Sequence, residues 1–370
     1  MKIGLVGLNQ TGKSTLFKLL TGKNDENTPA GGKGSANIGT CTVPDERIDF
    51  LSKLYNPKKT TYAKIELTDI AGFSVSEDSR SSGASRFLND LRPCDALVHV
   101  LRAFESDLVV HDFGSIDPAR DLEAVETEML FADLEMIEKR IGRIKAGKKI
   151  TKEHETEINL LNRCFLQLEQ GGSIRDMDLS EPERVYTKSF AFLTEKPRLT
   201  VVNLDEEGWQ KIAGQSSSSK PLPENIKNLQ ALCIKLNIPL LELNIGMELE
   251  ISRLPQEDKD LFMEDLGITE PGLDALVRAA YSLLGLISFI TVGEDEVRAW
   301  TIDAGTIARS AAGKIHSDIE RGFIRAEVVK YNDLFEHGSM PKVKEKGLFR
   351  LEGKEYVVED GDIINFRFNV

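Results

Sequence analysis

Residues 7–14 read GLNQTGKS, and this stretch decides the fold. A short apolar run at 3–6 precedes it, and an amphipathic run at 14–20 follows it. The spacing matches G-x-x-x-x-G-K-[S/T], a loop whose backbone N–H groups, together with the N-terminus of the next helix, surround a phosphate group. The sequence therefore predicts a strand, a phosphate-binding loop and a helix at the start of the chain.

Each fixed position of this loop has a mechanical role. Gly7 and Gly12 let backbone N–H groups curl around an anion. We expect Lys13 to reach the β- and γ-phosphates and to assist catalysis, and the Ser14 hydroxyl to bind Mg²⁺. The residues of this segment expected to bind a nucleotide are Asn9, Gln10, Thr11, Gly12, Lys13, Ser14 and Thr15.

A second motif, Asp69-Ile70-Ala71-Gly72, follows a strand-like run at 64–68. D-x-x-G is common by chance, but its position after a strand makes it informative. A carboxylate at the end of a strand beside the phosphate loop holds Mg²⁺ through water, and the glycine N–H senses a γ-phosphate. We therefore expect Asp69 to bind the metal and Gly72 to bind the nucleotide.

A base-binding motif is expected at Asn203-Leu204-Asp205-Glu206, after a buried-strand run at 198–202. GTPases carry N-K-x-D there, and its aspartate accepts hydrogen bonds from the N1–H and 2-amino groups of guanine, which adenine lacks. Asn203 keeps an amide that can pair with N6 and N7 of adenine, whereas Glu206 replaces the aspartate. The motif favours ATP, with GTP still possible.

Composition narrows the class of protein. The 370 residues are 41% hydrophobic and 29% charged, which indicates two or three folded domains. No apolar run approaches the roughly 18 residues of a membrane helix, so we expect a cytoplasmic protein without membrane contact. The net charge of −13 argues against non-specific coating of nucleic acid, and we expect no sequence-specific DNA partner. The four cysteines form no C-x-x-C pair, which argues against a zinc site.

The order of apolar runs predicts three parts. Strand and helix patterns alternate through 1–112 and again through 198–283, which predicts a parallel sheet in a discontinuous nucleotide-binding domain. Asp117-Pro118 starts a helix that runs to about 144 and carries two apolar stripes, and 158–168 supplies a helix to cover them. We therefore expect residues 113–197 to form an inserted antiparallel helical hairpin.

The pattern changes at about residue 284 to short strands. Only 308–320 looks helical beyond this point, so we expect a separate α+β domain at 284–370. The expected strands are 287–292, 297–302, 323–329, 348–351, 356–358 and 363–368. Two basic stretches, 139–152 and 342–354, are candidates for local RNA contact or are solvated element ends.

These motifs together resemble the YchF-type, Obg-like ATPases of the translation-factor-related GTPase class. The resemblance spans nearly the whole chain. It includes GLNQTGKSTLF at 7–17, VPDERID at 43–49, NPKKT at 56–60, DIAG at 69–72, NLDE at 203–206, and the blocks EDLGITEPGLDALVRAAYSLLGL, EVRAWTI, AAGKIH, GFIRAEVV, LEGKEY and DGDIINFRFNV toward the end. The resemblance implies an α/β P-loop Ras-like domain with an inserted helical hairpin and a C-terminal β-grasp (TGS) domain.

The resemblance also implies an activity. Such proteins are Mg²⁺-dependent nucleoside-triphosphate hydrolases that slowly hydrolyse ATP, often in preference to GTP, and associate with ribosomes or other RNPs. Phe73 stands where Ras-like GTPases carry the glutamine that orients the attacking water. His111 matches a loop histidine thought to assist that water, and Asn244 stands where a Ser-Ala pair usually backs the base.

The chain also departs from the family pattern. The phosphate loop usually reads GLPNVGKS, so Gln10 occupies an asparagine position that helps to bind K⁺, which argues against potassium stimulation. The first switch is PAGGKGSAN at 29–37, with Thr28 and Thr40 as weak substitutes for a Mg²⁺-binding threonine, and the second switch at 73–78 is also altered. The leading interpretation is therefore an ATPase, and the alternative is a nucleotide-sensing binding module with little or no hydrolysis. A small-molecule kinase would explain neither DIAG with NLDE nor the TGS-like end.

Overall fold

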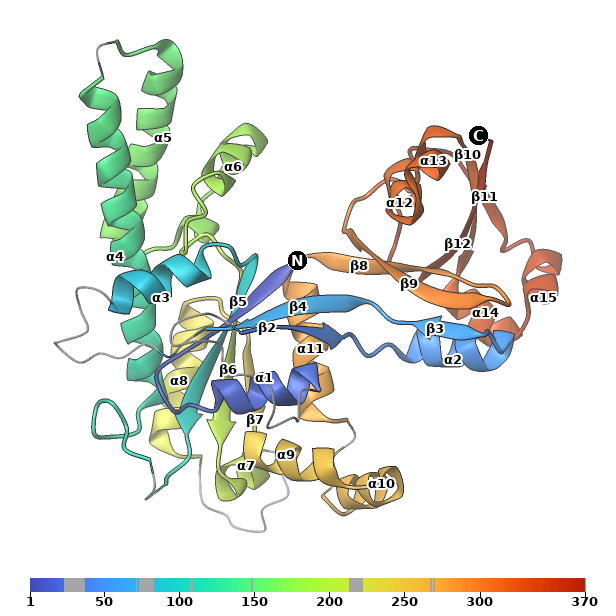
Figure 1. Cartoon of the computed structure of the whole chain (residues 1–370), viewed down its shortest axis with the longest axis horizontal. Coiled ribbons are helices and arrows are strands. Elements are labelled where there is room, and N and C mark those ends of the chain that lie inside the picture. The colour runs from blue at the N-terminus through green and yellow to red at the C-terminus, as the bar shows by residue number, and fades with distance from the viewer. Residues whose placement is uncertain are drawn as a thin grey trace. The chain divides into compact units, whose positions relative to one another are not determined.

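The computed structural model describes residues 1–22, 37–70, 72, 83–106, 109–147, 149–212, 222–266, 268 and 270–369. These residues form two compact units (Figure 1). The first unit contains Met1–Gly39 and Glu66–Leu273, and the second contains Thr40–Ile65 and Asp274–Val370. Among the described residues, none of the helices combines the length and the apolar character that a membrane span requires.

A six-stranded sheet forms the centre of the first unit. Its strands are β1 (Lys2–Val6), β2 (Asn37–Thr42), β4 (Lys64–Asp69), β5 (Ala96–Ala103), β6 (Arg198–Leu204) and β7 (Leu240–Leu243). They lie in the order β2-β4-β1-β5-β6-β7, and β4–β1, β1–β5, β5–β6 and β6–β7 are parallel pairs. Strand β6 is buried along its whole length, as expected for a parallel sheet covered on both faces.

Helices surround this sheet and extend from it. They are α1 (Lys13–Thr21), α3 (Gly83–Leu91), α4 (Pro118–Lys145), α5 (Lys152–Glu169), α6 (Glu181–Lys188), α7 (Glu206–Ile212), α8 (Glu224–Lys235), α9 (Ile245–Arg253) and α10 (Gln256–Asp265), with a 3₁₀ turn at Ile174–Asp176. Helix α1 packs against β1 and α9. The α/β fold predicted from the alternating apolar runs is confirmed.

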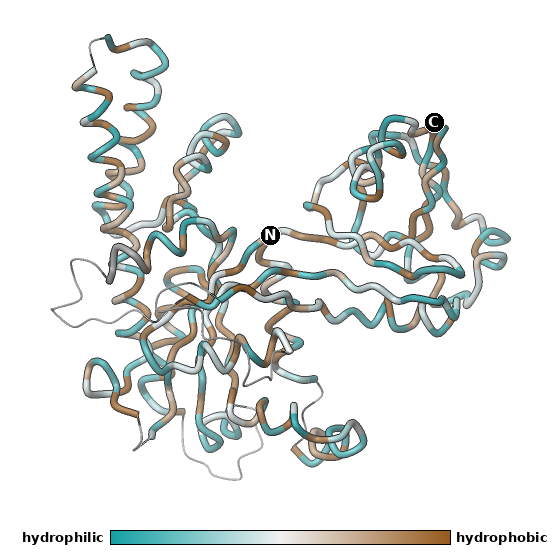
Figure 2. Tube along the Cα trace, viewed as in Figure 1, coloured by the Kyte–Doolittle hydropathy of each residue, from teal (hydrophilic) through white to brown (hydrophobic). Residues whose placement is uncertain are grey.

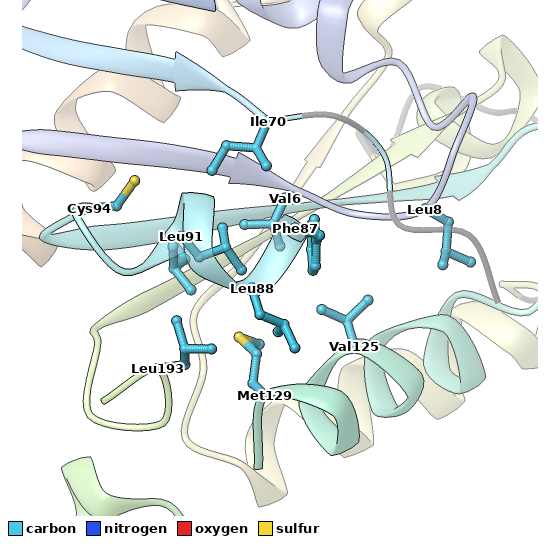
Figure 3. Close-up of a cluster of buried hydrophobic side chains, with 11 residues drawn as sticks. Val6, Leu8, Ile70, Phe87, Leu88, Leu91, Cys94, Val125, Met129 and Leu193 are labelled. Carbon is cyan, nitrogen blue, oxygen red and sulfur yellow. The ribbon is translucent and has the colours of Figure 1, made fainter. Parts of the chain in front are cut away.

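One core cluster joins the sheet to α3 and α4 (Figure 3). Phe87 and Leu88 point from α3 toward Val125 and Met129 of α4, and Val6 closes the cluster from β1. Burial of side chains of this size stabilises the fold by about 1.5–3 kcal/mol each. The cluster fixes the N-terminal half of α4 on the sheet, immediately beside the end of β1.

The hairpin of α4 and α5 uses the second apolar stripe of α4. Ile137 and its neighbours pack against Leu161 and Leu168 of α5, whereas the first stripe packs on the sheet and on helices α3 and α8. Asp117 caps α4, because its Oδ1 accepts from the Arg120 N–H at 3.2 Å. Hydrophobic and hydrophilic residues alternate along both helices (Figure 2), as expected for a hairpin with one solvated side.

The second unit contains another six-stranded sheet. Its strands are β3 (Lys59–Thr61), β8 (Leu286–Thr291), β9 (Glu296–Asp303), β10 (Phe323–Lys330), β11 (Arg350–Glu352) and β12 (Asp362–Phe368), in the order β11-β10-β12-β8-β9-β3. Its helices are α2 (Glu46–Tyr55), α11 (Gly272–Leu283), α12 (Ala308–Ile315), α13 (Ser317–Arg321), α14 (Tyr331–His337) and α15 (Met340–Glu345). Phe289, Val328 and Phe366 form its core with α12.

Two sequence predictions for this unit are wrong. Residues 356–358 are not a strand, because Tyr356 N–H bonds to Gly353 O in a local turn and only Val357 forms a bridge, to Ile307. Helices α14 and α15 were missed. Gly338 ends α14 in the left-handed conformation, and α15 has a proline in its first turn, so the signals for both ends are present in the sequence.

The segment Thr40–Ile65 belongs to the second compact unit although it lies early in the chain. Its strand β3 pairs in parallel with β9, and Arg47 of α2 donates to Asp360 at 2.7 Å. Sequence reasoning placed this segment inside the domain of 1–112. The domain boundaries 1–112 with 198–283, 113–197 and 284–370 stay a prediction.

Asp133, which is fully buried on α4, should be important for stability. Its carboxylate accepts from the N–H groups of Leu193 and Thr194 at 3.1 and 2.8 Å, and from the Thr194 hydroxyl at 2.9 Å. We expect Asp133→Ala to lower the free energy of unfolding by about 3 kcal/mol, because it leaves these donors buried without an acceptor. Urea unfolding followed by circular dichroism measures this, with the exposed Glu138→Ala as control. A loss no larger than that of the control would contradict the assignment.

Candidate functional site

The phosphate loop joins β1 to α1 through three unusual backbone conformations. Gly7, Gln10 and Gly12 have φ angles of 145°, 60° and 101°. A Cβ on Gly7 would lie 2.3 Å from the Val100 carbonyl oxygen, and one on Gly12 would lie 2.7 Å from Asn203 Nδ2. Both positions therefore require glycine for space as well as for conformation.

Lys13 lies at the start of α1 and is only 5% exposed. Its ammonium group donates to the Leu8 carbonyl oxygen across the loop. Burial lowers the pKa of Lys13 from 10.5 to about 8, and the charges of Asp69 and Asp112 offset part of that effect. A buried cation that bonds to a backbone carbonyl of the loop is positioned to receive phosphate oxygens.

Ser14 and Asp69 lie side by side. The Ser14 hydroxyl donates to Asp69 Oδ2 at 3.0 Å, which brings one oxygen from α1 against one from the end of β4. Burial raises the pKa of Asp69, while the Ser14 hydroxyl and the Lys13 charge oppose the rise. Two oxygen ligands beside a phosphate loop fit Mg²⁺, which takes few protein ligands and completes its octahedron with phosphates and water.

Asn203 reaches the loop from the end of β6. Its Nδ2 donates to the Thr11 carbonyl oxygen at 3.1 Å, and its Oδ1 accepts from the Ile245 N–H at 3.1 Å. The amide therefore connects the phosphate loop to the start of α9. One N–H of the amide remains for a ligand.

The other expected base-binding residues, Asn244 and Glu206, make contacts of their own. Asn244 caps α9, because its Oδ1 accepts from the Met247 N–H at 2.9 Å. Glu206 is exposed at the start of α7, where it accepts from Gln210 Nε2 at 3.1 Å. Thr15 is half-buried on α1, and Gln10 is exposed at the loop tip.

Both ring nitrogens of His111 take part in hydrogen bonds, and its predicted catalytic role stays a prediction. Its Nε2 lies 2.8 Å from Asp121 Oδ2, and its Nδ1 accepts from the Phe113 N–H at 3.2 Å. These contacts assign the proton to Nε2 and use both ring nitrogens. The side chain is 6% exposed, and its partner Asp121 in the first turn of α4 is fully buried.

The neighbouring residue, Asp112, faces the phosphate loop. Asn9 Nδ2 donates to Asp112 Oδ2 at 3.4 Å. Gly72 lies on the other side of Asn9, where a Cβ on Gly72 would come within 2.3 Å of Asn9 Oδ1. The predictions for Phe73, the Thr28 substitute and most of both switches fall outside the described residues.

A cavity of about 740 Å³ opens at the carboxyl ends of β5 and β6. Arg102, which is 2% exposed, lines it and donates to the carbonyl oxygens of Phe104 and Val109 at 3.0 and 3.1 Å. Ligands bind at this edge in parallel α/β sheets. Sequence reasoning missed Arg102, because an arginine inside an apolar run carries no motif.

The parallel sheet, the phosphate loop and its buried lysine define a P-loop nucleoside-triphosphate hydrolase. Two family models match the chain: one described as "50S ribosome-binding GTPase" matches residues 2–130, and one described as "Protein of unknown function (DUF933)" matches residues 286–369.

Relatives that match over nearly the whole chain identify the family more narrowly than these two models do. The chain is 42% identical to the Ribosome-binding ATPase YchF of Bacillus subtilis, covering 99% of each, and 37% identical to that of Escherichia coli O157:H7, covering 100% of this chain and 99% of the relative. The solved structure of the Schizosaccharomyces pombe YchF GTPase matches with a TM-score of 0.83 at 28% identity, covering 99% of this chain and 97% of that one. The chain belongs to the YchF family.

The low pKa of Lys13 predicts a pH dependence of nucleotide binding. A lysine with a pKa of about 8 loses its charge as the pH rises through that value, and phosphate binding must then restore the proton. We expect ATP to bind about tenfold more weakly at about pH 9 than at about pH 7. Calorimetry in buffers of different ionisation enthalpy should show proton uptake at the higher pH. Binding without proton uptake would contradict this pKa.

Proposed function

We propose that this chain binds Mg²⁺-ATP, hydrolyses it slowly, and couples its nucleotide state to association with the ribosome. The observation that carries the proposal is the group of Lys13, Ser14 and Asp69 within one phosphate loop and the adjoining strand end. These three side chains supply one cation and two metal-binding oxygens at the place where β- and γ-phosphates would lie. Such a group serves phosphoryl transfer by positioning and charge stabilisation.

Each side chain has a separate task in this proposal. Lys13 donates to oxygens of the β- and γ-phosphates, exchanging its bond to the Leu8 carbonyl for them. Ser14 and Asp69 would hold Mg²⁺, which would supply positive charge to neutralise the phosphates. The Gly72 N–H lies at the loop edge, where it can bond to a γ-phosphate oxygen.

Preference for ATP is supported by the base motif. Glu206 is exposed and engaged along α7, and the aspartate of N-K-x-D that recognises guanine is absent. The remaining N–H of Asn203 is the group we assign to N7 of the base. This N–H pairs equally with N7 of adenine and guanine, so the preference depends on the absence of a guanine-specific acceptor.

Ribosome association is proposed from the names of the relatives and from a basic groove. The B. subtilis and E. coli relatives are named ribosome-binding ATPases. A groove of about 550 Å³ beside α3 and α4 is lined by Arg92, Lys139, Arg140 and Arg143, and also by Glu135. Lys139 pairs with Glu135, Arg140 with Glu157 and Arg92 with Asp133, so the ion pairs neutralise part of this charge. Clustered cations of this kind fit the phosphate backbone of RNA. A ribosomal partner also implies a cytoplasmic location.

Within this proposal, the hairpin and the C-terminal domain are the parts that contact the ribosome. We assign these roles to the predicted domains 113–197 and 284–370, with 1–112 and 198–283 as the nucleotide-binding domain. The core cluster that fixes α4 on the sheet supports the first assignment, because it connects the hairpin rigidly to the side of the phosphate loop.

Competition between nucleotides tests the proposed specificity. We expect unlabelled ATP to displace a fluorescent ATP analogue at least about tenfold more effectively than GTP, the ratio given by about 1.4 kcal/mol. Lys13→Ala should bind both weakly, because the cation that faces the phosphates is lost. A preference for GTP would overturn the interpretation of Asn203 and Glu206. Bound ATP that stays intact for hours in a single-turnover assay would favour the sensing module.

Co-sedimentation with ribosomes tests the partner. We expect the double variant Arg143→Glu/Lys145→Glu to reduce binding at least about tenfold, since both side chains are exposed near the end of α4 and charge reversal repels RNA phosphates. The control is Lys235→Glu, an exposed change on α8. ATP affinity should stay the same in both. Equal sedimentation of the double variant and the control would remove the hairpin from the contact.

A further inference from the structure

Lys196 lies at the edge of the first sheet that is opposite the phosphate loop. It comes just before β6 in the chain, and it is 8% exposed. The phosphate loop follows the carboxyl end of β1, and β1, β5 and β6 are parallel. The length of β6, roughly 20 Å at about 3.3 Å per residue, therefore separates Lys196 from the phosphate-binding edge.

Two backbone carbonyl groups hold the Lys196 side chain. Its Nζ donates to the Arg92 carbonyl oxygen at 2.9 Å and to the Cys94 carbonyl oxygen. Among the described residues, no carboxylate forms an ion pair with it. A neutral amine has two N–H groups and one lone pair, so these two carbonyl groups use both N–H groups and leave the lone pair free.

The groups around Lys196 favour this neutral amine. Burial lowers the pKa of Lys196, and the charge of Arg92 adds to the effect, whereas Cys94, Asp95 and Asp133 oppose it. Burial also raises the pKa of Cys94 to about 11, so this thiol is neutral at pH 7 and supplies no counter-charge. Asp133 is already paired with Arg92. An ammonium group at this place is therefore poorly compensated.

A cavity of about 370 Å³ is lined by Lys196, the start of β5 and the segment that joins α6 to β6. Its charged lining residues are Arg92, Lys188, Lys196, Asp95 and Glu195. Both carboxylates already accept a hydrogen bond, Asp95 from the Lys2 backbone N–H at 2.7 Å and Glu195 from the Thr187 hydroxyl at 2.6 Å. The cavity has room for a reagent of a few atoms beside the amine.

Lys188 gives this cavity a cation that can hold an anionic reagent. Its side chain is exposed, and in the part of the chain that the structure describes it forms no ion pair. A lysine ammonium group binds phosphate as a point charge. The cavity thus combines an amine that can attack a carbonyl carbon with a cation that can bind a phosphate group, and an acyl phosphate carries both of these targets.

We propose that Lys196 is a site of acylation by small acyl phosphates, and that Lys188 binds their phosphate group. The Lys196 nitrogen forms a bond to the acyl carbon, and the bond from that carbon to the phosphate oxygen breaks. The electron pair of the broken bond leaves on inorganic phosphate, and the nitrogen gives its extra proton to water. The amide product has one N–H where the amine had two, so either the Arg92 or the Cys94 carbonyl group loses its donor.

Acetylation of the full-length protein by acetyl phosphate tests the proposal, with the modified fraction of each lysine followed by peptide mass spectrometry. Burial alone would slow the reaction in the folded chain, because it keeps the reagent away from the amine. We expect Lys196 instead to react at least about threefold faster in the folded chain than in guanidinium chloride, because unfolding removes the cause of its lowered pKa. This ratio should fall between about pH 7 and about pH 10, since the unfolded amine then loses its proton too.

The variant Lys188→Glu tests the second residue. Acetylation of Lys196 by acetyl phosphate should slow at least about threefold, because the cation that holds the phosphate is replaced by a like charge. Acetylation by acetic anhydride, which is uncharged, should change less. The control Lys314→Glu, an exposed change on α12 in the other compact unit, should leave both reactions unchanged.

The outcomes are distinct. Slower acetylation of Lys196 in the folded chain than in the unfolded chain would overturn the assignment of a reactive amine. An unchanged rate in Lys188→Glu, or equal slowing with both reagents, would overturn the role of Lys188 in phosphate binding. The assay contains no ATP, so neither result depends on the proposed ATPase function.

Discussion

The Asn203 side chain makes the interaction on which the rest of the site depends. Its amide bonds to the Thr11 carbonyl oxygen and to the Ile245 N–H, so β6, the phosphate loop and α9 are held at one point. Gly12 packs so closely on this amide that no side chain fits there. The loop therefore keeps its shape before a ligand arrives, and binding does not have to pay the entropy of ordering it.

A second set of bonds holds the loop that precedes α4. Asp121 is fully buried and accepts from Arg120 at 2.9 Å while pairing with His111 at 2.8 Å. Burial raises the pKa of Asp121, and the hydrogen bonds from Arg120 and His111 oppose the rise. A carboxylate in the first turn of a long helix is also favoured by the helix dipole. The His111 side chain is thus anchored to the first turn of α4.

Sequence reasoning could predict the parts of the site in which phosphate or metal binding requires one particular residue type at each position. The geometry of phosphate binding predicts the glycines of the loop, Lys13, Ser14 and the carboxylate of Asp69 at the end of β4, and the structure places them together. The helical hairpin could also be predicted from the sequence, because its helices carry long apolar stripes. Sequence reasoning could not predict the roles of Arg102, Asp112 and Asp121, because the tertiary fold, or a surface loop without periodicity, determines which groups they contact. The missed α14 and α15 are short, so their end signals at Gly338 and in the first turn of α15 had no apolar stripe to support them.

The hydrogen bonds at the phosphate loop and those at the start of α4 involve two adjacent residues, Asp112 and His111. The two regions are therefore mechanically connected. Asp112 faces Asn9 of the phosphate loop, and His111, one residue earlier, is bonded to α4. Consecutive Cα atoms are about 3.8 Å apart, so a displacement of Asp112 larger than a side-chain rotation must move His111 too. His111 can then either carry the start of α4 with it or break its bond to a buried carboxylate. Val125 and Met129 fix the following turns of α4 in the core cluster, so moving the start of α4 strains the packing of the helix on the sheet. Breaking the bond to His111 instead leaves Asp121 with Arg120 as its remaining side-chain partner among the described residues. Either way, a change at the phosphate loop has a free-energy cost at the base of the hairpin.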